Sequence, residues 1–125
     1  MISTMIISDG CVFSVVLTRL LMKRFPLLMF EEARNSKEAL ARIPVLKPVL
    51  VFIDTALTVG NGFDLTAQIK TAFPGIIIIL FMNHDIPEYR EAARRCGADF
   101  SFSKQSSSMV EIFNLVESTL LHVVP

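Results

Sequence analysis

Val49-Leu50-Val51-Phe52-Ile53-Asp54 is a run of five apolar residues that ends in a carboxylate. A second run of the same kind is Ile76-Ile77-Ile78-Ile79-Leu80-Phe81. Continuous apolar runs of this length are typical of strands that are covered on both faces, as in a parallel sheet. Shorter runs at residues 5–7 and 27–30, and a weaker one at residues 100–102, complete a set of five expected strands.

Helical patterns occupy the segments between these strands. One apolar stripe ends before Pro26, and it consists of Phe13, Val16, Leu17, Leu20 and Leu21. Others recur at Leu65, Ile69 and Phe73, and at Met109, Ile112, Phe113, Val116 and Leu120. Asn35 with Glu38, Asp85 with Glu88, and Ser108 with Glu111 each have the spacing of a helix N-cap pair.

Strand and helix therefore alternate five times. Right-handed crossovers then predict an α/β fold, a doubly wound parallel sheet with helices on both faces. We expect residues 1–125 to form a single domain.

Composition excludes several classes of protein. Hydrophobic residues make up 52% of the 125 residues, and 12 basic residues balance 12 acidic ones, so no basic footprint for direct nucleic-acid binding is expected. No apolar run reaches the roughly 18–20 residues of a membrane span, and the N-terminus has no signal-peptide pattern. Two cysteines suit a reducing compartment, and we expect a cytoplasmic location.

Polar residues follow the expected strands at one edge of the sheet, where ligands of such folds bind. They are Asp9, Asp54, Met82 with Asn83, and Lys104. Two carboxylates suit Mg²⁺, a lysine would offset phosphoryl charge, and a carboxylate can act as a nucleophile. The alternative from spacing alone is that the aspartates form caps and turns and the lysine is solvated.

Three motifs, in order along the chain, carry a resemblance to the receiver domain of bacterial response regulators. Asn35-Ser-Lys-Glu-Ala-Leu40 resembles the usual start of the second helix. Phe52-Ile-Asp-Thr-Ala-Leu-Thr-Val-Gly-Asn-Gly-Phe-Asp-Leu65 is similar to the phosphorylation loop, with Gly62 eight residues after Asp54. Gly97-Ala-Asp-Phe-Ser-Phe-Ser-Lys104 resembles the turn, strand and lysine that close the site.

The resemblance implies a flavodoxin-like sheet in the order 2-1-3-4-5 and a role for each matched residue. Asp54 would be the phosphoacceptor, Asp9 and the carbonyl of Ala56 would join it as Mg²⁺ ligands, and Lys104 would contact the phosphoryl group. The domain would regulate through its own phosphotransfer and dephosphorylation rather than act as an enzyme on other substrates.

The resemblance also implies partners: a sensor histidine kinase, and a DNA-binding output domain outside these residues. Lys104 is followed by Gln-Ser-Ser where many receivers have proline, as in receivers of helix-turn-helix transcription factors. Whether an output domain follows residue 125 is left open.

Several positions depart from the family pattern. Ser8-Asp9-Gly10 stands where two acids are usual, and the phase of the following helix favours Asp9 as the second acid with Ser8 in the first slot; the alternative puts Gly10 in the second slot. Met82 replaces the serine or threonine of the phosphorylation switch, and a thioether cannot donate a hydrogen bond. Ser101 occupies the aromatic switch position, and Thr58 replaces a proline.

Two functional hypotheses follow. The first is a Mg²⁺-dependent phosphoacceptor with an atypical switch, and the second is a degenerate receiver that acts as a phosphorylation-independent dimerisation or docking module. A phosphatase of the haloacid dehalogenase type is disfavoured, because Ala56 stands where that family has its general acid.

The sequence indicates two candidate interaction surfaces. From Val12 to Met22 only Ser14, Thr18 and Arg19 are polar, which favours a helix with a dimer contact or an effector surface in addition to its core face. The helix near residues 88–95 carries mixed charges and lies where receivers of this kind often pair. We also expect Asn61, Asp64, Thr66, Gln68 and Lys70 to face solvent.

Overall fold

Five parallel strands form one sheet in the order β2-β1-β3-β4-β5, as the resemblance to receiver domains implies. The computed structural model describes residues 1–57 and 60–123. The strands are β1 (Ile2–Ile7), β2 (Leu28–Ala33), β3 (Leu50–Asp54), β4 (Ile77–Met82) and β5 (Phe100–Ser103). All of β3 and nearly all of β4 are buried, which explains why β4 is apolar throughout and β3 is apolar up to its last residue, Asp54.

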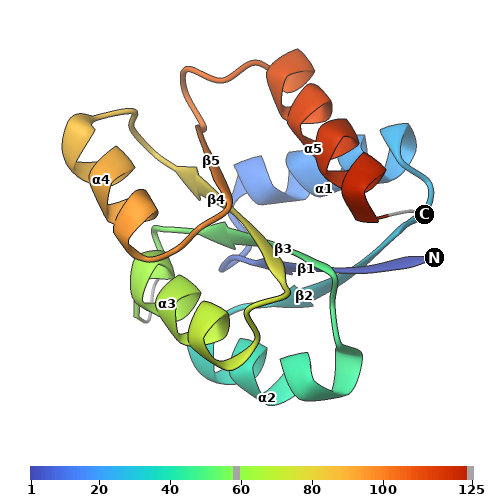
Figure 1. Cartoon of the computed structure of the whole chain (residues 1–125). Helices are drawn as coiled ribbons and strands as arrows, with labels where there is room; N and C mark the ends of the chain where they lie inside the picture. The colour runs from blue at the N-terminus through green and yellow to red at the C-terminus, as the bar shows by residue number, and fades with distance from the viewer. Residues whose placement is uncertain (58–59, 124–125) are drawn as a thin grey trace.

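Helices cover both faces of the sheet (Figure 1). On one face lie α1 (Val12–Arg24) and α5 (Met109–Val123), which share a core with Phe52, Phe81 and Phe102. On the other face lie α2 (Ser36–Leu46), α3 (Gly62–Ala72) and α4 (Pro87–Arg95), packed on a separate core that includes Ile53, Leu80 and Met82. Alternate residues of a strand therefore belong to different cores.

Two of the three expected N-cap pairs are confirmed. The Asn35 side chain accepts a hydrogen bond from the Glu38 amide at 2.8 Å, and the hydroxyl of Ser108 accepts one from the Glu111 amide at 3.1 Å. The expected capping box at Asp85 is wrong, because Ile86 is the N-cap of α4 and makes no side-chain cap. Asp85 instead forms an ion pair with Arg90.

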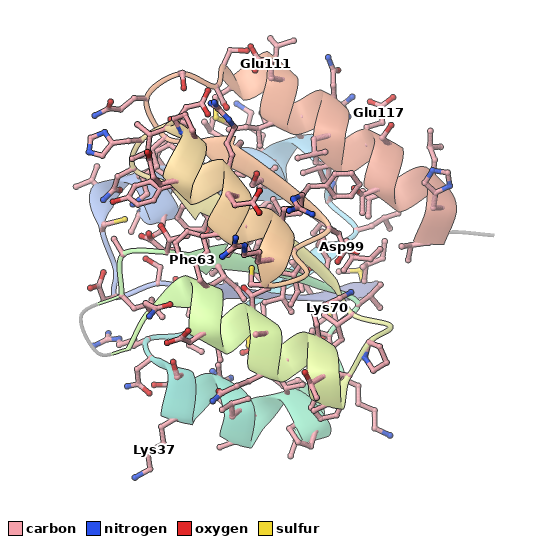
Figure 2. All side chains as sticks on the ribbon, turned by 60° about the vertical axis from the view of Figure 1, so that its left-hand side comes forward. Lys37, Phe63, Lys70, Asp99, Glu111 and Glu117 are labelled. Atoms are coloured by element: carbon pink, nitrogen blue, oxygen red, sulfur yellow. The ribbon has the colours of Figure 1, made fainter. Side chains whose placement is uncertain are left out.

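The expectation that α3 turns its polar residues to solvent is wrong at two positions. Thr66 is fully buried and donates to the Gly62 carbonyl, and Lys70 reaches into the junction of α3 with the start of β5 (Figure 2). The Lys70 ammonium lies 3.1 Å from the Asp99 carboxylate and 2.8 Å from the Ile76 carbonyl. The long side chain thus ties two sheet connections together.

In the part of the chain that the structure describes, no helix combines the length and the apolarity needed to cross a membrane.

Candidate functional site

Asp54 is a buried carboxylate at the carboxyl end of β3. Its side chain is 1% exposed, and its Oδ1 accepts a hydrogen bond from the Ala56 amide at 2.9 Å. The pairing of Asp54 with Phe81 continues in a bond from the Thr55 amide to the Phe81 carbonyl, which holds the strand end beside β4. A buried charge needs such partners, because an unpaired one would be costly.

Gly62 allows the loop after β3 to return close to this carboxylate. A Cβ built on Gly62 would lie 2.6 Å from the Asp54 carbonyl oxygen and 2.7 Å from the Thr55 Cα. The Gly62 amide donates to the Thr55 carbonyl at 3.2 Å, so α3 begins directly against the end of β3. The glycine eight residues after Asp54 is therefore required by a close backbone approach.

Lys104 supplies the positive charge opposite Asp54. Its ammonium lies 2.9 Å from Asp54 Oδ2, and the Lys104 side chain is 15% exposed. The Lys104 amide donates to the Met82 carbonyl at 2.8 Å, which fixes the start of the lysine beside the end of β4. Residues fifty positions apart thus meet as predicted, and the alternative of a solvated lysine is wrong.

An aromatic cluster lies beside this lysine, and sequence reasoning did not assign it a place at the site. The Lys104 ammonium is 5.8 Å from the ring centroid of Phe13 and 5.4 Å from that of Phe81. Phe102 stacks on Phe81 with centroids 5.8 Å apart. Contacts between a cation and aromatic faces of this kind are favourable when solvent is excluded.

The end of β1 adds Ser8 and Asp9 to the same edge of the sheet. Ile7 pairs with Ile53 in register, so Ser8 stands beside Asp54 and Asp9 lies one residue further along. Ser8 is buried, and its hydroxyl accepts a hydrogen bond from the Gly10 amide at 3.3 Å. Asp9 is exposed.

Cys11 also belongs to the site, although the sequence analysis assigned it no role there. Its Sγ lies 3.7 Å from Asp54 Oδ2 and 4.0 Å from the Lys104 ammonium. Cys11 is the N-cap of α1, so the first turn of this helix forms one wall of the site. No local sequence pattern could have revealed this contact, because 43 residues separate Cys11 from Asp54 and the placement of α1 brings them together.

The carboxylate and carbonyl oxygens at this site are the kind of ligand that a hard divalent cation prefers. Asp54 Oδ1 accepts one hydrogen bond, from the Ala56 amide, and retains a lone pair, whereas Oδ2 accepts from the Lys104 ammonium and from the Cys11 thiol. Asp9 and the Ala56 carbonyl supply additional oxygens. Among residues 1–57 and 60–123, no three His, Cys, Asp or Glu side chains are grouped to hold a metal. Two carboxylates and one carbonyl would therefore leave the remaining coordination positions to water, as Mg²⁺ commonly accepts.

The atypical switch positions differ in their surroundings. The Met82 side chain is 2% exposed and belongs to the core beneath α2, α3 and α4, so it fills the switch position with an apolar group. Ser101 is exposed on the edge strand β5, whereas Phe102 belongs to the core between the sheet and the helices α1 and α5. Thr58 lies outside the described residues.

The chain matches a family model and several known proteins. The family model described as the response regulator receiver domain matches residues 4–117. A curated relative, the protein-glutamate methylesterase/protein-glutamine glutaminase of Bacillus subtilis (strain 168), is 23% identical over 128 aligned positions, which cover 99% of this chain and 35% of that protein. The chain thus spans about a third of the length of this relative.

Solved structures share the fold over nearly the whole chain. The signal receiver domain of a DNA-binding response regulator (merR) from Colwellia psychrerythraea 34H is 27% identical, with a TM-score of 0.82 over 99% of this chain and 98% of that one. A two-component response regulator from Clostridium difficile is 18% identical, with a TM-score of 0.87 over 100% of both chains. A LuxR-family response regulator from Aurantimonas sp. SI85-9A1 is 24% identical, with a TM-score of 0.83 over 96% of this chain and 85% of that one.

A buried aspartate paired with a lysine at the carboxyl edge of a parallel sheet, and a family match over residues 4–117, lead to one conclusion: the chain belongs to the response regulator receiver domain family.

Proposed function

We propose that this receiver domain accepts a phosphoryl group on Asp54 from a sensor histidine kinase, in a Mg²⁺-dependent reaction, with an atypical switch. The observation that carries the proposal is the contact between the buried Asp54 carboxylate and the Lys104 ammonium, 2.9 Å apart at the edge of the sheet where ligands of this fold bind. A pair that served stability alone could be replaced by apolar residues with little loss.

The chain's own groups account for the phosphoryl transfer. A carboxylate oxygen of Asp54 would attack the phosphorus of a phosphohistidine, the bond between nitrogen and phosphorus would break, and the histidine nitrogen would keep the electron pair. The product would be an acyl phosphate, which water later hydrolyses to inorganic phosphate and the free carboxylate. The Lys104 ammonium would move from the carboxylate to the phosphoryl oxygens and offset their charge.

Asp9, Asp54 and the Ala56 carbonyl would hold Mg²⁺, which neutralises phosphoryl charge and aligns the donor when it is bound. The serine at position 8 leaves one carboxylate fewer than two adjacent acids would provide. Because divalent affinity depends on the charge of the ligands, we expect a Mg²⁺ affinity weaker than a site with two such acids would have.

Beryllofluoride, a phosphoryl analogue, tests the proposal. Titration in the presence and absence of Mg²⁺ would be followed by the amide chemical shifts around Asp54, Met82 and Lys104. We expect saturable, Mg²⁺-dependent shifts that disappear in Asp54→Asn. Asp85→Asn is the matched control, because Asp85 is an exposed aspartate in the loop before α4 and is absent from the site. No response at millimolar Mg²⁺ would refute the proposal.

The second candidate, a phosphorylation-independent dimerisation or docking module, is supported by the switch positions. Met82 has no hydroxyl to draw toward a phosphoryl group, and exposed Ser101 has no ring to reorient. If beryllofluoride binds but shifts only the amides near Asp54, phosphorylation occurs without a shape change. If the amide shifts of β4, β5 and α4 also change, another group performs the role that the serine or threonine and the aromatic residue have in other receivers.

The proposed partners follow from family membership. A sensor histidine kinase would donate the phosphoryl group, and a DNA-binding output domain would read the result, because the merR relative is a DNA-binding response regulator. The free thiols of Cys11 and Cys96 suit the reducing cytoplasm where such a kinase would act.

A further inference from the structure

Lys104 is a side chain that does not stay in one place by itself. Lysine has a flexible aliphatic stem and a strongly hydrated ammonium, so a lysine without partners extends into water. The Lys104 ammonium nevertheless lies 2.9 Å from Asp54 Oδ2, and the side chain is only 15% exposed. A further polar contact, to the Cys11 thiol at 4.0 Å, is weak. Among its polar contacts, the ammonium therefore depends mainly on the charge of one carboxylate.

Two aromatic rings give the ammonium a second kind of contact. It lies over the ring of Phe81, 5.4 Å from the centroid, and over the ring of Phe13, 5.8 Å from the centroid. Both distances are within the about 6 Å over which the negative face of a ring attracts a cation. Because Lys104 is largely shielded from water, this attraction is stronger than it would be at an exposed site.

The rings are held in place by the sheet and by each other. Phe81 pairs with Asp54 on one neighbouring strand and with Phe102 on the other, so the three side chains form one row on the same face of the sheet. Phe102 stacks on Phe81 with centroids 5.8 Å apart. Phe13, from α1, lies 5.6 Å from Phe81 and 6.3 Å from Phe102. The positions of the rings are therefore set by packing and do not depend on the lysine.

We propose that Phe13 is a positioning residue for phosphoryl transfer: its ring, together with that of Phe81, keeps the Lys104 ammonium beside Asp54 when the charge of that carboxylate is taken up by an incoming group. In the free site the full charge of Asp54 attracts the ammonium. A bound divalent cation repels the ammonium, and the attacking oxygen gives up its charge, whereas the ring faces continue to attract the ammonium. The role in transfer rests on the proposed function, but the hold on the ammonium does not.

Packing alone is the alternative role for Phe13, and the two roles require different properties of the side chain. Packing requires volume, whereas attraction of a cation requires electron density on the face of the ring. Fluorine atoms at the edge of the ring withdraw this density and change its shape little. Phe13→Leu removes the ring and retains an apolar side chain. A fluorinated ring at position 13 therefore separates the two roles.

Nuclear magnetic resonance relaxation of the lysine ammonium groups in the free domain tests the hold directly. Lys104 should have a clearly higher order parameter than Lys37, which is exposed on α2 (Figure 2). With trifluorophenylalanine in place of Phe13, the order parameter of Lys104 should fall toward that of Lys37. The same replacement at Phe113 is the matched control, because Phe113 belongs to the same core and its ring contacts Phe25. An order parameter that the fluorinated ring at position 13 leaves unchanged would overturn the proposal.

Beryllofluoride affinity in the presence of Mg²⁺ tests the consequence for the site. The dissociation constant should rise about threefold to tenfold both in Phe13→Leu and with the fluorinated ring, which corresponds to the loss of one partly buried contact between a cation and a ring. The Phe113 variants should bind like the wild type, and amide spectra would confirm that every variant folds.

The possible failures can be told apart. If the wild type does not bind beryllofluoride, the proposed function fails and the role in transfer fails with it, while the order parameters still decide whether the rings hold the lysine. If Phe13→Leu weakens binding but the fluorinated ring does not, Phe13 acts through packing alone and the positioning role is refuted. If the Phe113 variants weaken binding equally, the effect belongs to the core as a whole, which also refutes it.

Discussion

Gly62→Ala tests the geometry of the phosphoacceptor site through the backbone that supports it. The added methyl group would lie 2.6 Å from the Asp54 carbonyl oxygen and 2.7 Å from the Thr55 Cα. Both neighbours are backbone atoms, so neither can rotate away, and relief requires that the end of β3 or the start of α3 move. The substitution should therefore disturb both stability and the position of Asp54.

The expected magnitude follows from two opposing effects. Overpacking of this kind costs about 1–3 kcal/mol, and the upper part of the range applies because two fixed atoms clash. Alanine recovers up to about 1 kcal/mol because it favours the helix more than glycine does. The free energy of unfolding should fall by about 2 kcal/mol. With about 2.1 cal/mol/K of unfolding entropy per residue and 125 residues, the melting temperature should fall by about 8 °C.

Thermal and urea unfolding followed by circular dichroism would measure this loss. Gly75→Ala is the matched control, because nothing lies within 4 Å of a Cβ at Gly75 and its backbone is not left-handed. That variant should be as stable as the wild type or more stable by up to about 1 kcal/mol. If Gly62→Ala unfolds at the same temperature as Gly75→Ala, the close approach that positions Asp54 is refuted.

Three further predictions concern the scaffold. Asn35→Ala removes the side-chain cap of the Glu38 amide and should lower stability by about 1 kcal/mol in urea unfolding, whereas an unchanged midpoint would contradict the cap. Lys70→Met removes the ion pair with Asp99 and should lower the free energy of unfolding by about 1–2 kcal/mol, which a thermal melt can measure. Burial raises the pKa of the Cys96 thiol above its ordinary value of 9.0, so the folded state holds this proton more tightly than the unfolded state. Stability should be retained below pH 9 and decline as the pH rises from there through the raised pKa, and Cys96→Ala should flatten that decline in melts across this pH range.

The sequence by itself determined the order of elements along the chain and the parallel, doubly wound sheet, whereas the strand order 2-1-3-4-5 was implied by the resemblance to receiver domains. Residues 49–53 and 76–81 are apolar at every position because β3 and β4 are buried on both faces, and that burial leaves a clear signal in the sequence. Asp54 and Lys104 were predicted to meet for a related reason: parallel strands bring their carboxyl ends to one edge, whatever the distance along the chain.

Local signals were reliable only where short-range bonds decide the structure. The cap at Asn35 joins residues three positions apart, so the pattern sufficed. Asp85 stands three residues before Glu88, the same spacing, but it forms an ion pair with Arg90 instead. An exposed carboxylate can bind any of several nearby donors. Lys70 was expected in solvent because its partner, Asp99, is 29 residues away along the chain, and only the tertiary structure brings α3 beside the turn that precedes β5.

Only the tertiary structure decided which groups surround the Asp54 carboxylate. Cys11 and Phe13 enter the site because the first turn of α1 packs over the ends of β3 and β4. Phe81 and Phe102 form their cluster beside Lys104 because alternate strand residues point to opposite faces and adjacent strands fix the register. Such contacts depend on helix placement and strand register together, and no local stretch of the sequence encodes that combination. Burial and chain direction, in contrast, leave a pattern in the sequence.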